Sequence, residues 1–338
     1  MEKQSKKIAI LILNWNGVKL LEKYLPSVVK YNSSEAEIIV FDNASEDNSI
    51  LFLKNTFPDI KYIEFKENFG FAKGYNKAIN LITHKYVVLL NSDVRVTKNW
   101  LQAPLEFLDS NTDYAACQPK ILDDKTPLKF EYAGASGGYI DILGYPFCRG
   151  RIFKSLEDDN GQHDQIKDIF WASGAALFTR REVYLKLGGL DESFFAHQEE
   201  IDLCWRILNE GHKIACIPQS IVYHLGGASL DKSRSKKTFL NFRNNLVMLL
   251  KNLPLYALPI IFIRLVLDGL AGIKFITEGK IIHSFAIFKA HISFYLKIPS
   301  TFKKRRKTTA ISSKIKYKGS ILIDYYLKGN KRFNDLNW

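Results

Sequence analysis

Tyr86-Val87-Val88-Leu89-Leu90-Asn91-Ser92-Asp93 is the most informative stretch of the sequence, because it passes from five apolar residues directly into three polar ones. A run this short and uniformly apolar is typical of a strand that is buried on both faces, as in a parallel sheet. Asn91, Ser92 and Asp93 then fall at the strand's carboxyl end, where open α/β sheets bind ligands. A carboxylate there can hold a divalent cation, and the cation a diphosphate. By itself, Asp93 also fits a strand-to-helix turn in which it caps the next helix.

Three further strand-like runs precede this one, and each is followed by a segment with helical spacing. The strand-like runs are residues 7–13, 37–41 and 60–65, and the helical segments are 18–31, 48–56 and the stretch that leads from 68 through 82. This alternation predicts an α/β fold with a mostly parallel central sheet, right-handed crossovers and flanking helices.

Polar residues end the first two strands as well. Asn14 and Asn16 follow the first, and Asp42 and Asn43 follow the second. Asp42 can accept hydrogen bonds from a nucleobase or a ribose, and Asp93 can ligate Mg²⁺ or Mn²⁺. The carboxyl ends of parallel strands meet at one edge, so these residues together predict a site for a nucleotide diphosphate.

Gly70 and Gly74 do not indicate a dinucleotide-binding fingerprint. That pattern belongs directly after the first strand, where this chain has Asn14-Trp15-Asn16-Gly17.

The second half of the chain has a looser pattern. Residues 126–168 are rich in Gly, Asp and aromatic residues without a clear period, which predicts loops and short antiparallel strands facing a substrate. Residues 169–179 are strand-like around Gly174, and 201–209 form an amphipathic helical pattern. Glu199 and Glu200 stand at the start of that helix. A carboxylate there can act as a general base, or it can simply be favoured by the helix dipole.

His224 is followed by Gly226-Gly227 in a predicted turn. A lone histidine is more often structural than a ligand, but in this turn a ring nitrogen could reach a metal or a phosphate.

The net charge of +13 calls for a polyanionic partner, which can be nucleic acid, anionic lipid or a phosphorylated substrate. The four cysteines form no C-x-x-C pair, so neither a zinc site nor a disulfide framework is indicated, which fits a reducing compartment. The N-terminal residues contain no apolar segment of the signal-peptide kind, and we expect this part to stay in the cytosol.

The C-terminal part changes character after about residue 238. Residues 253–276 are long enough to span a bilayer, which takes about 20 apolar residues, but Arg264 and Asp268 are costly in lipid. Their i, i+4 spacing allows them to pair. From 279 through 323 the chain has no acidic residue, and basic residues, including the run from Lys303 to Lys307, alternate with aromatic ones. This mixture favours an interfacial membrane segment; a nucleic-acid surface and the solvated face of an ordinary helical subdomain are the alternatives.

Six short motifs resemble a known family. Four of them are similar to the serial motifs of family 2 glycosyltransferases with the GT-A fold, and two resemble the rhamnosyltransferase-like branch. The four are ILNWNG at 12–17, VFDNASED at 40–47, NFGFAKGYN at 68–76 and LLNSD at 89–93; the two are GGLDESFF at 188–195 and EEIDLCWR at 199–206. The resemblance covers roughly residues 7–230, in order and with the family's spacing.

The resemblance implies inverting transfer of a sugar from a nucleotide-diphosphate donor. It implies that Asp42 holds the base and that Asp93, with Mg²⁺ or Mn²⁺, neutralises the leaving diphosphate. His224 matches a position that approaches the metal or the diphosphate, and Glu200 matches the general base. The remaining residues implied at the donor site are Asn14, Asn16, Asn43, Asn68, Gly70, Gly74, Asn91 and Ser92.

The chain departs from the family pattern at two places. The D-x-D motif reads Asn91-Ser92-Asp93, which leaves Asp93 as the single carboxylate. The Glu-Asp pair reads Glu199-Glu200, so the base is one methylene longer, and Glu199 or Asp202 could contribute.

These observations predict a GT-A catalytic domain over residues 1–235, with a nucleotide-binding half at 1–98 and an acceptor-binding half at 99–235. Residues 236–338 are predicted to be a helical, basic, membrane-interfacial region. We expect a polyprenyl-diphosphate-linked saccharide as the acceptor, an anionic membrane surface on the cytoplasmic side as the location, and no nucleic-acid partner. The setting would be synthesis of a surface polysaccharide.

Three other classes of protein stay open. A non-catalytic scaffold of the same fold would bind donor without turnover. A nucleotidyltransferase would need a Gly-rich triphosphate loop after the first strand, which residues 14–17 lack. A nucleic-acid binder would show steeply salt-dependent binding to any duplex. Which sugar and which base the donor carries is also open.

Overall fold

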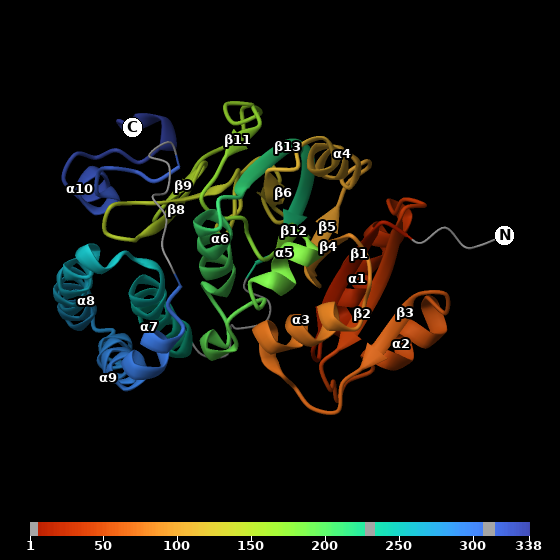
Figure 1. Cartoon of the computed structure of the whole chain (residues 1–338), viewed down its shortest axis with the longest axis horizontal. Helices are drawn as coiled ribbons and strands as arrows, with labels where there is room; N and C mark the ends of the chain where they lie inside the picture. Colours follow the sequence, from red (N-terminus) through yellow and green to blue (C-terminus); the bar gives the residue numbers. More distant parts are fainter. Residues whose placement is uncertain (1–5, 227–233, 307–314) are drawn as a thin grey trace.

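The computed structural model describes residues 6–226, 234–306 and 315–338. Gly227 and Lys307, which the sequence singled out, lie outside these residues. Within them, a nine-stranded sheet forms the centre of the fold, in the order β11-β13-β6-β12-β4-β1-β2-β3, with β5 paired to β13 (Figure 1). Its strands are β1 Ile8–Asn14, β2 Ala36–Asp42, β3 Lys61–Glu64, β4 Tyr86–Asn91, β5 Val94–Val96, β6 Tyr114–Asp123, β11 Lys167–Asp168, β12 Ala176–Arg180 and β13 Lys213–His224.

The register of the sheet brings the polar strand ends together. β1 runs parallel to both β2 and β4, so that Asn14 pairs with Asp42 and Leu13 with Asn91. β13 runs parallel to β6 and antiparallel to β5, which places His224 opposite Val94, next to Asp93. The predicted α/β fold is confirmed, with antiparallel pairing around β12 inside a mostly parallel sheet.

Both faces of the sheet are covered because both faces of its strands are apolar. In β1, Ala9 and Leu11 belong to one hydrophobic core, while Ile8, Ile10 and Ile12 belong to the other. The first core contains residues of α3 Gly70–Asn80, α5 Arg181–Lys186 and α6 Glu199–Asn209; the second contains residues of α1 Val18–Lys30, α2 Ser49–Thr56 and α4 Gln102–Ser110. This two-sided burial is what the uniformly apolar strands predict.

The segment 126–168 forms the predicted short antiparallel strands. They are β7 Gly138–Ile140, β8 Pro146–Cys148, β9 Arg151–Ile152 and β10 Ser155–Leu156, which make a second, small sheet. The strand expected over 169–179 is wrong in its first half: β12 begins only at Ala176. The chain bends there because the Ser173 backbone N–H donates to the side chain of Gln118 (2.8 Å) rather than to a neighbouring strand.

The C-terminal helices are α7 Arg234–Asn252, α8 Pro259–Thr277, α9 Ile281–Lys303 and α10 Ile321–Tyr326, with short 3₁₀ turns at Glu192–Phe194, Leu255–Ala257 and Phe333–Asp335. Helices α7, α8 and α9 lie together beside α6, at the end of the molecule away from α2 and β3 (Figure 1). Leu246, Met248 and Leu249 of α7 are buried in the same core as α6. The predicted boundary at 235/236 stays a prediction, and the hydrophobic core is continuous across it.

Candidate active site

Asp42 and Asn14 form a tight group at the ends of β1 and β2. Asn14 Nδ2 donates to Asp42 Oδ2 (2.9 Å), and Ser45 donates to the Asp42 carboxylate through its backbone N–H (2.8 Å) and its hydroxyl (2.7 Å). Both Asn14 and Asp42 are buried. The carboxylate is therefore held in one orientation by neutral donors, and Ser45 is a site residue that the sequence did not single out by role.

The loop that precedes α3 is tied to the same edge of the sheet. Asn43 Nδ2 donates to Asn68 Oδ1 (2.8 Å), and Asn43 Oδ1 accepts from the Phe69 N–H (2.9 Å). Gly70 has a positive φ of 72°, a conformation that favours glycine. The structure thus brings Asn43, Asn68 and Gly70 together, and their place at a donor site stays a prediction.

Two other predicted donor-site residues have clear local functions. A Cβ on Gly74 would come within 2.8 Å of Leu13, so this glycine lets α3 approach β1 closely. Asn16 has a φ of 48°, and its Oδ1 accepts from the Glu46 N–H (2.8 Å), which fixes the loop after β1 against the loop after β2. Packing and loop geometry explain both positions.

Asp93 and His224 meet at the carboxyl ends of β4 and β13. His224 Nε2 lies 3.1 Å from Asp93 Oδ1, and Asn91 Nδ2 lies 3.5 Å from the same nitrogen. Ser92, which lies between Asn91 and Asp93 in the sequence, is half-buried. The other ring nitrogen, His224 Nδ1, lies 3.3 Å from Oε1 of Glu131, a buried residue of the 126–168 segment that the sequence analysis missed. Nothing in the local pattern around Glu131 marks it.

The two carboxylates control the charge of His224. Burial by itself would lower the pKa of the imidazole, but the hydrogen bonds and charges of Asp93 and Glu131 outweigh it and raise the pKa to about 10. His224 is therefore an imidazolium held between two carboxylates at neutral pH.

The donor atoms here fit a divalent cation that is shared with a ligand. Within the described part of the chain, no group of three or more His, Cys, Asp or Glu side chains is arranged to hold a metal alone. The Asp93 oxygen would supply one ligand, and His224 Nε2 would supply a second once the cation has displaced its proton. Mg²⁺ typically binds to one or two carboxylates plus substrate phosphates, and an oxygen and imidazole pair also suits Mn²⁺. The residues thus fit a metal site that a diphosphate completes.

Glu199 and Glu200 begin α6 after a strained loop. Phe195, His197 and Gln198 have φ values of 68°, 69° and 70°, which non-glycine residues rarely adopt outside functional sites. The Oε2 atoms of both glutamates are buried and have no hydrogen-bond partner among the described residues. Burial raises the pKa of Glu200 to about 7, and it raises the pKa of Glu199, which also faces the charge of Glu200, well above its usual range. Glu200 is the less buried of the two.

Three consecutive residues of α7 hold this strained loop. Asn244 Nδ2 lies within hydrogen-bond distance of the carbonyls of Phe194 (3.1 Å), Ala196 (2.9 Å) and His197 (2.8 Å). Arg243 donates to the Phe194 carbonyl (2.9 Å), and Asn245 donates to Gln198 Oε1 (3.0 Å). The C-terminal region thus supports the pair of glutamates. A sequence signal was available, since Arg243-Asn244-Asn245 directly precedes the apolar run at 246–250.

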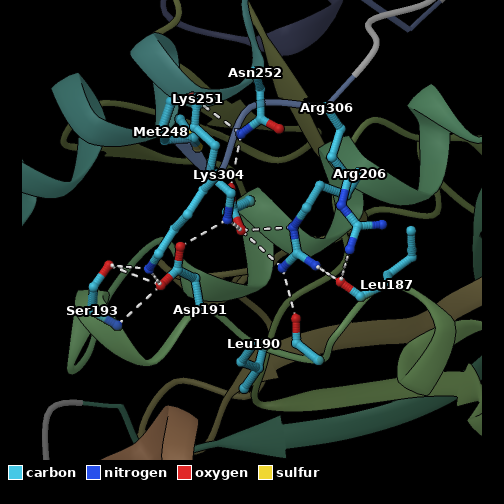
Figure 2. A network of polar contacts seen from close by, with 12 residues as sticks. Leu187, Leu190, Asp191, Ser193, Arg206, Met248, Lys251, Asn252, Lys304 and Arg306 are labelled. Carbon is cyan, nitrogen blue, oxygen red and sulfur yellow. Dashed lines mark hydrogen bonds and ion pairs between the residues drawn. The ribbon is translucent and has the colours of Figure 1, made fainter. Parts of the chain in front are cut away.

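A buried ionic network connects α6 to the C-terminal helices (Figure 2). Lys251 of α7 donates to Asp191 (2.8 Å) and Asp202 (2.9 Å), and Asp202 also pairs with Arg206 (2.8 Å). Burial opposes ionisation of Asp202, but the charges of Arg206 and Lys251 outweigh it and hold its pKa below the usual range. Asn252 Nδ2 donates to the other Asp202 oxygen (2.8 Å). Asp202, which the sequence left as a possible contributor to catalysis, is thus fully engaged in structure.

Replacing Asp202 by asparagine should destabilise the protein by about 3–5 kcal/mol, because Arg206 and Lys251 would stay buried without their shared counter-charge. The measurement is the urea dependence of unfolding. Asp113→Asn, which removes an exposed ion pair with Lys213, is the matched control and should leave the unfolding midpoint almost unchanged. Equal midpoints for the two variants would contradict a structural role for the network.

Comparisons with known proteins agree with this geometry. The sequence profile described as "Glycosyl transferase family 2" matches residues 9–184, just over half of the chain. The chain belongs to this family and is a glycosyltransferase of the GT-A fold.

Among curated relatives, the low-salt glycan biosynthesis hexosyltransferase Agl10 of Haloferax volcanii is 26% identical over 247 residues, covering 70% of this chain and 73% of the relative. The N-acetylglucosaminyl-diphospho-decaprenol L-rhamnosyltransferase of Mycobacterium tuberculosis is 23% identical over 222 residues, covering 60% and 71%. Such relatives support the rhamnosyltransferase-like branch. Among solved structures, the mannosyltransferase of Pyrobaculum calidifontis in complex with GDP-Man and Mn²⁺ superposes with a TM-score of 0.54 at 14% identity, covering 86% of this chain and 87% of that one.

Proposed function

We propose that this glycosyltransferase moves a sugar, with inversion, from a nucleotide-diphosphate donor to a hydroxyl group of a lipid-linked saccharide. The observation that carries the proposal is that two unlike groups lie near the same edge of the sheet. The Asn91 N–H donates to the Ala175 carbonyl (3.0 Å), and a Cβ on the adjacent Gly174 would lie 3.7 Å from the Cβ of Glu200. Asp93 and His224 offer ligands for a metal shared with a diphosphate, and Glu200 offers a half-buried carboxylate with an unpartnered oxygen.

The donor side rests on residues that are already ordered. The Asp42 carboxylate, oriented by Asn14 and Ser45, lies where a nucleobase or ribose would donate to it. Asn43, Asn68 and Gly70 form the adjoining wall. A bound Mg²⁺ or Mn²⁺ would neutralise the charge that develops on the leaving diphosphate. Asp93 and His224 would hold that ion, with Asn91 and Ser92 shaping the same turn.

The acceptor side rests on Glu200. In its ionised form it takes the proton from the acceptor hydroxyl while that oxygen attacks the anomeric carbon, and the bond to the diphosphate breaks on the opposite face of the sugar. A pKa of about 7 leaves a substantial ionised fraction at neutral pH and makes the carboxylate basic enough to accept the proton. Glu199 is more deeply buried, and we assign it the supporting position.

The test is hydrolysis of donors by the full chain, using UDP-, dTDP- and GDP-sugars with Mn²⁺ or Mg²⁺. Turnover of one donor would establish the reaction class and name the donor. Tight, metal-dependent binding of a donor with neither hydrolysis nor transfer to any lipid-linked acceptor would contradict the proposal. It would favour the alternative of a non-catalytic nucleotide-sugar-binding protein.

A lipid-linked acceptor is supported by the name of the mycobacterial relative, a diphospho-decaprenol rhamnosyltransferase, and by the surface of α8 and α9. Leu255–Thr277 is long and apolar enough to cross a membrane, and only 22% of its apolar window is buried. Arg264 and Asp268 face the protein: they are buried, they pair with each other (3.7 Å) as predicted, and Arg264 donates to the Leu143 carbonyl (3.1 Å). The outward face is apolar and exposed; it includes Phe262, Val266, Leu270, Ile273, Phe285, Phe288 and Leu296.

Changing two of these residues, Phe262→Glu and Phe288→Glu, should weaken binding to vesicles with anionic lipid by about tenfold or more. An interfacial segment binds through its apolar area together with basic side chains, here Lys280 and Lys289 among others. The measurement is co-sedimentation with phosphatidylglycerol vesicles, with phosphatidylcholine vesicles for comparison. The control is Leu51→Glu, since Leu51 of α2 is equally exposed but lies on the donor half. If Leu51→Glu weakens vesicle binding as much as the Phe262→Glu/Phe288→Glu change does, the α8–α9 face is not the membrane surface.

A further inference from the structure

Arg151 of β9 is a buried cation that forms no ion pair with Asp or Glu among the described residues, although the charge of Glu131 acts on it. It is 7% exposed, and its Nε atom is buried without a hydrogen-bond partner among the described residues. Its one hydrogen bond within that part of the chain goes to the Cys148 sulfur (3.4 Å), a weak acceptor. An unpaired buried charge is costly unless something compensates it.

A second arginine in the same small sheet shows how different this is. Arg149 is equally buried, and its guanidinium donates to the carbonyls of Ser136 (3.0 Å), His163 (3.4 Å) and Gln165 (3.1 Å). That side chain is satisfied by the protein and has a structural function. Arg151 has the same charge and burial, but its donors are left over for a ligand.

Glu131 and Glu200 act electrostatically on Cys148, the residue to which Arg151 donates. The pKa of the Cys148 thiol is raised, first by burial and further by the charges of Glu131 and Glu200, while Arg151 acts against the shift. Cys148 thus has Arg151, Glu131 and Glu200 around it. Glu131 links the two groups, because its Oε1 lies 3.3 Å from His224 Nδ1 and its charge also acts on Arg151.

An exposed aromatic ring connects Arg151 to the surface. The guanidinium lies 4.5 Å from the centre of the Tyr132 ring, and Tyr132 is 49% exposed. The ring of Phe153, which directly follows β9, lies 5.5 Å from the ring of Tyr326 of α10, and the Lys274 ammonium of α8 lies 5.1 Å from the Tyr326 ring centre. Arg151 therefore belongs to a hairpin that contacts α10 and, through Tyr326, the end of α8, the helix with the exposed apolar face.

We propose that Arg151 binds the phosphate group next to the acceptor sugar, in the diphosphate that joins the saccharide to its lipid. A guanidinium presents a planar fork of donors that matches phosphate oxygens in a bidentate manner. The lipid end would lie toward α8, and the saccharide would reach Glu200. This inference rests on the proposed function, because it assigns the anionic part of that acceptor.

The experiment measures binding to the full chain by calorimetry, with UDP and Mn²⁺ at saturation to occupy the donor site. The probes are farnesyl diphosphate and farnesol, which share the lipid and differ in the anion. Wild type should bind the diphosphate at least about tenfold more tightly than the alcohol, and Arg151→Gln should lose that preference. Arg151→Lys should keep part of it, because the charge remains without the fork. Lys154→Gln, which removes an exposed charge from the same small sheet, should behave as wild type.

Three results would overturn the proposal. The first is unchanged farnesyl diphosphate affinity in Arg151→Gln; the second is an equal loss of UDP affinity, which would place Arg151 on the donor side. If Arg151→Gln does not fold, as judged by circular dichroism, Tyr132→Ala tests the same site from its exposed side. The third contradicting result is then unchanged affinity for farnesyl diphosphate in both Tyr132→Ala and Arg151→Lys. This experiment measures binding and does not depend on turnover. If wild type prefers farnesyl diphosphate to farnesol but turns over no donor, the proposed reaction is contradicted and the proposed phosphate site at Arg151 still holds.

Discussion

Replacing Glu200 by glutamine should lower the rate of sugar transfer by about 10²–10⁴-fold while leaving donor affinity within about twofold, because the amide keeps the shape of the side chain but cannot accept the hydroxyl proton. The measurement is kcat for transfer, with the dissociation constant for the donor measured in parallel. Glu200→Asp should retain far more activity than Glu200→Gln, since it restores a carboxylate at the cost of one methylene of reach. Glu210→Gln, at the other end of the helix, is the matched control and should be active.

The pH dependence of the transfer rate is a second test of Glu200 as the general base. Burial raises the pKa of Glu200 to about 7, so the unprotonated form that acts as a base grows as the pH rises through that value. The rate of wild type should therefore fall on the acidic side with a midpoint near pH 7. A rate that does not change between pH 5 and 9 would contradict the assignment of the base to Glu200. So would full activity in Glu200→Gln together with no activity in Glu199→Gln.

Replacing Asp93 by asparagine should weaken Mn²⁺ binding in the presence of UDP by at least about tenfold and lower kcat/KM by about 10²-fold or more. The reason is that Asp93 is the single carboxylate of the Asn91-Ser92-Asp93 turn, so its loss leaves His224 as the remaining ligand from the site described above. Electron paramagnetic resonance of Mn²⁺ reports the binding independently of turnover. Asp59→Asn, an exposed acid on the donor half, serves as the control. Unaltered Mn²⁺ affinity in Asp93→Asn would mean that the metal site lies elsewhere.

The arrangement of the polar ends of β1, β2 and β4 could be predicted from sequence because its geometry is local and repetitive. Each apolar run ends in polar residues, and parallel pairing in register brings those ends to one edge, as the pairing of Asn14 with Asp42 shows. The meaning of Gly74 was harder to see, because only the approach of α3 to Leu13 shows that this position requires a residue without a side chain.

The acceptor half could be predicted only in part. Glu199 and Glu200 carry a motif, but their raised pKa values come from burial that distant segments provide. Glu131 meets His224 across 93 positions of chain, and it comes from a segment whose irregular pattern marks no residue above another. Arg151 gives no sign in the sequence that it differs from Arg149, because the difference lies in which carbonyls each guanidinium reaches.

The sequence by itself determined the α/β architecture, and it predicted Asp42, Asp93 and Glu200 as site residues, because periodicity and short motifs are properties of neighbouring residues. The tertiary structure alone decided that His224 lies between two carboxylates, that α7 holds the loop before Glu200, and that Arg264 and Asp268 turn toward the protein while α8 keeps an apolar outer face. The physical reason is that pKa, satisfied donors and exposure depend on which side chains meet in space, and those meetings join segments far apart along the chain.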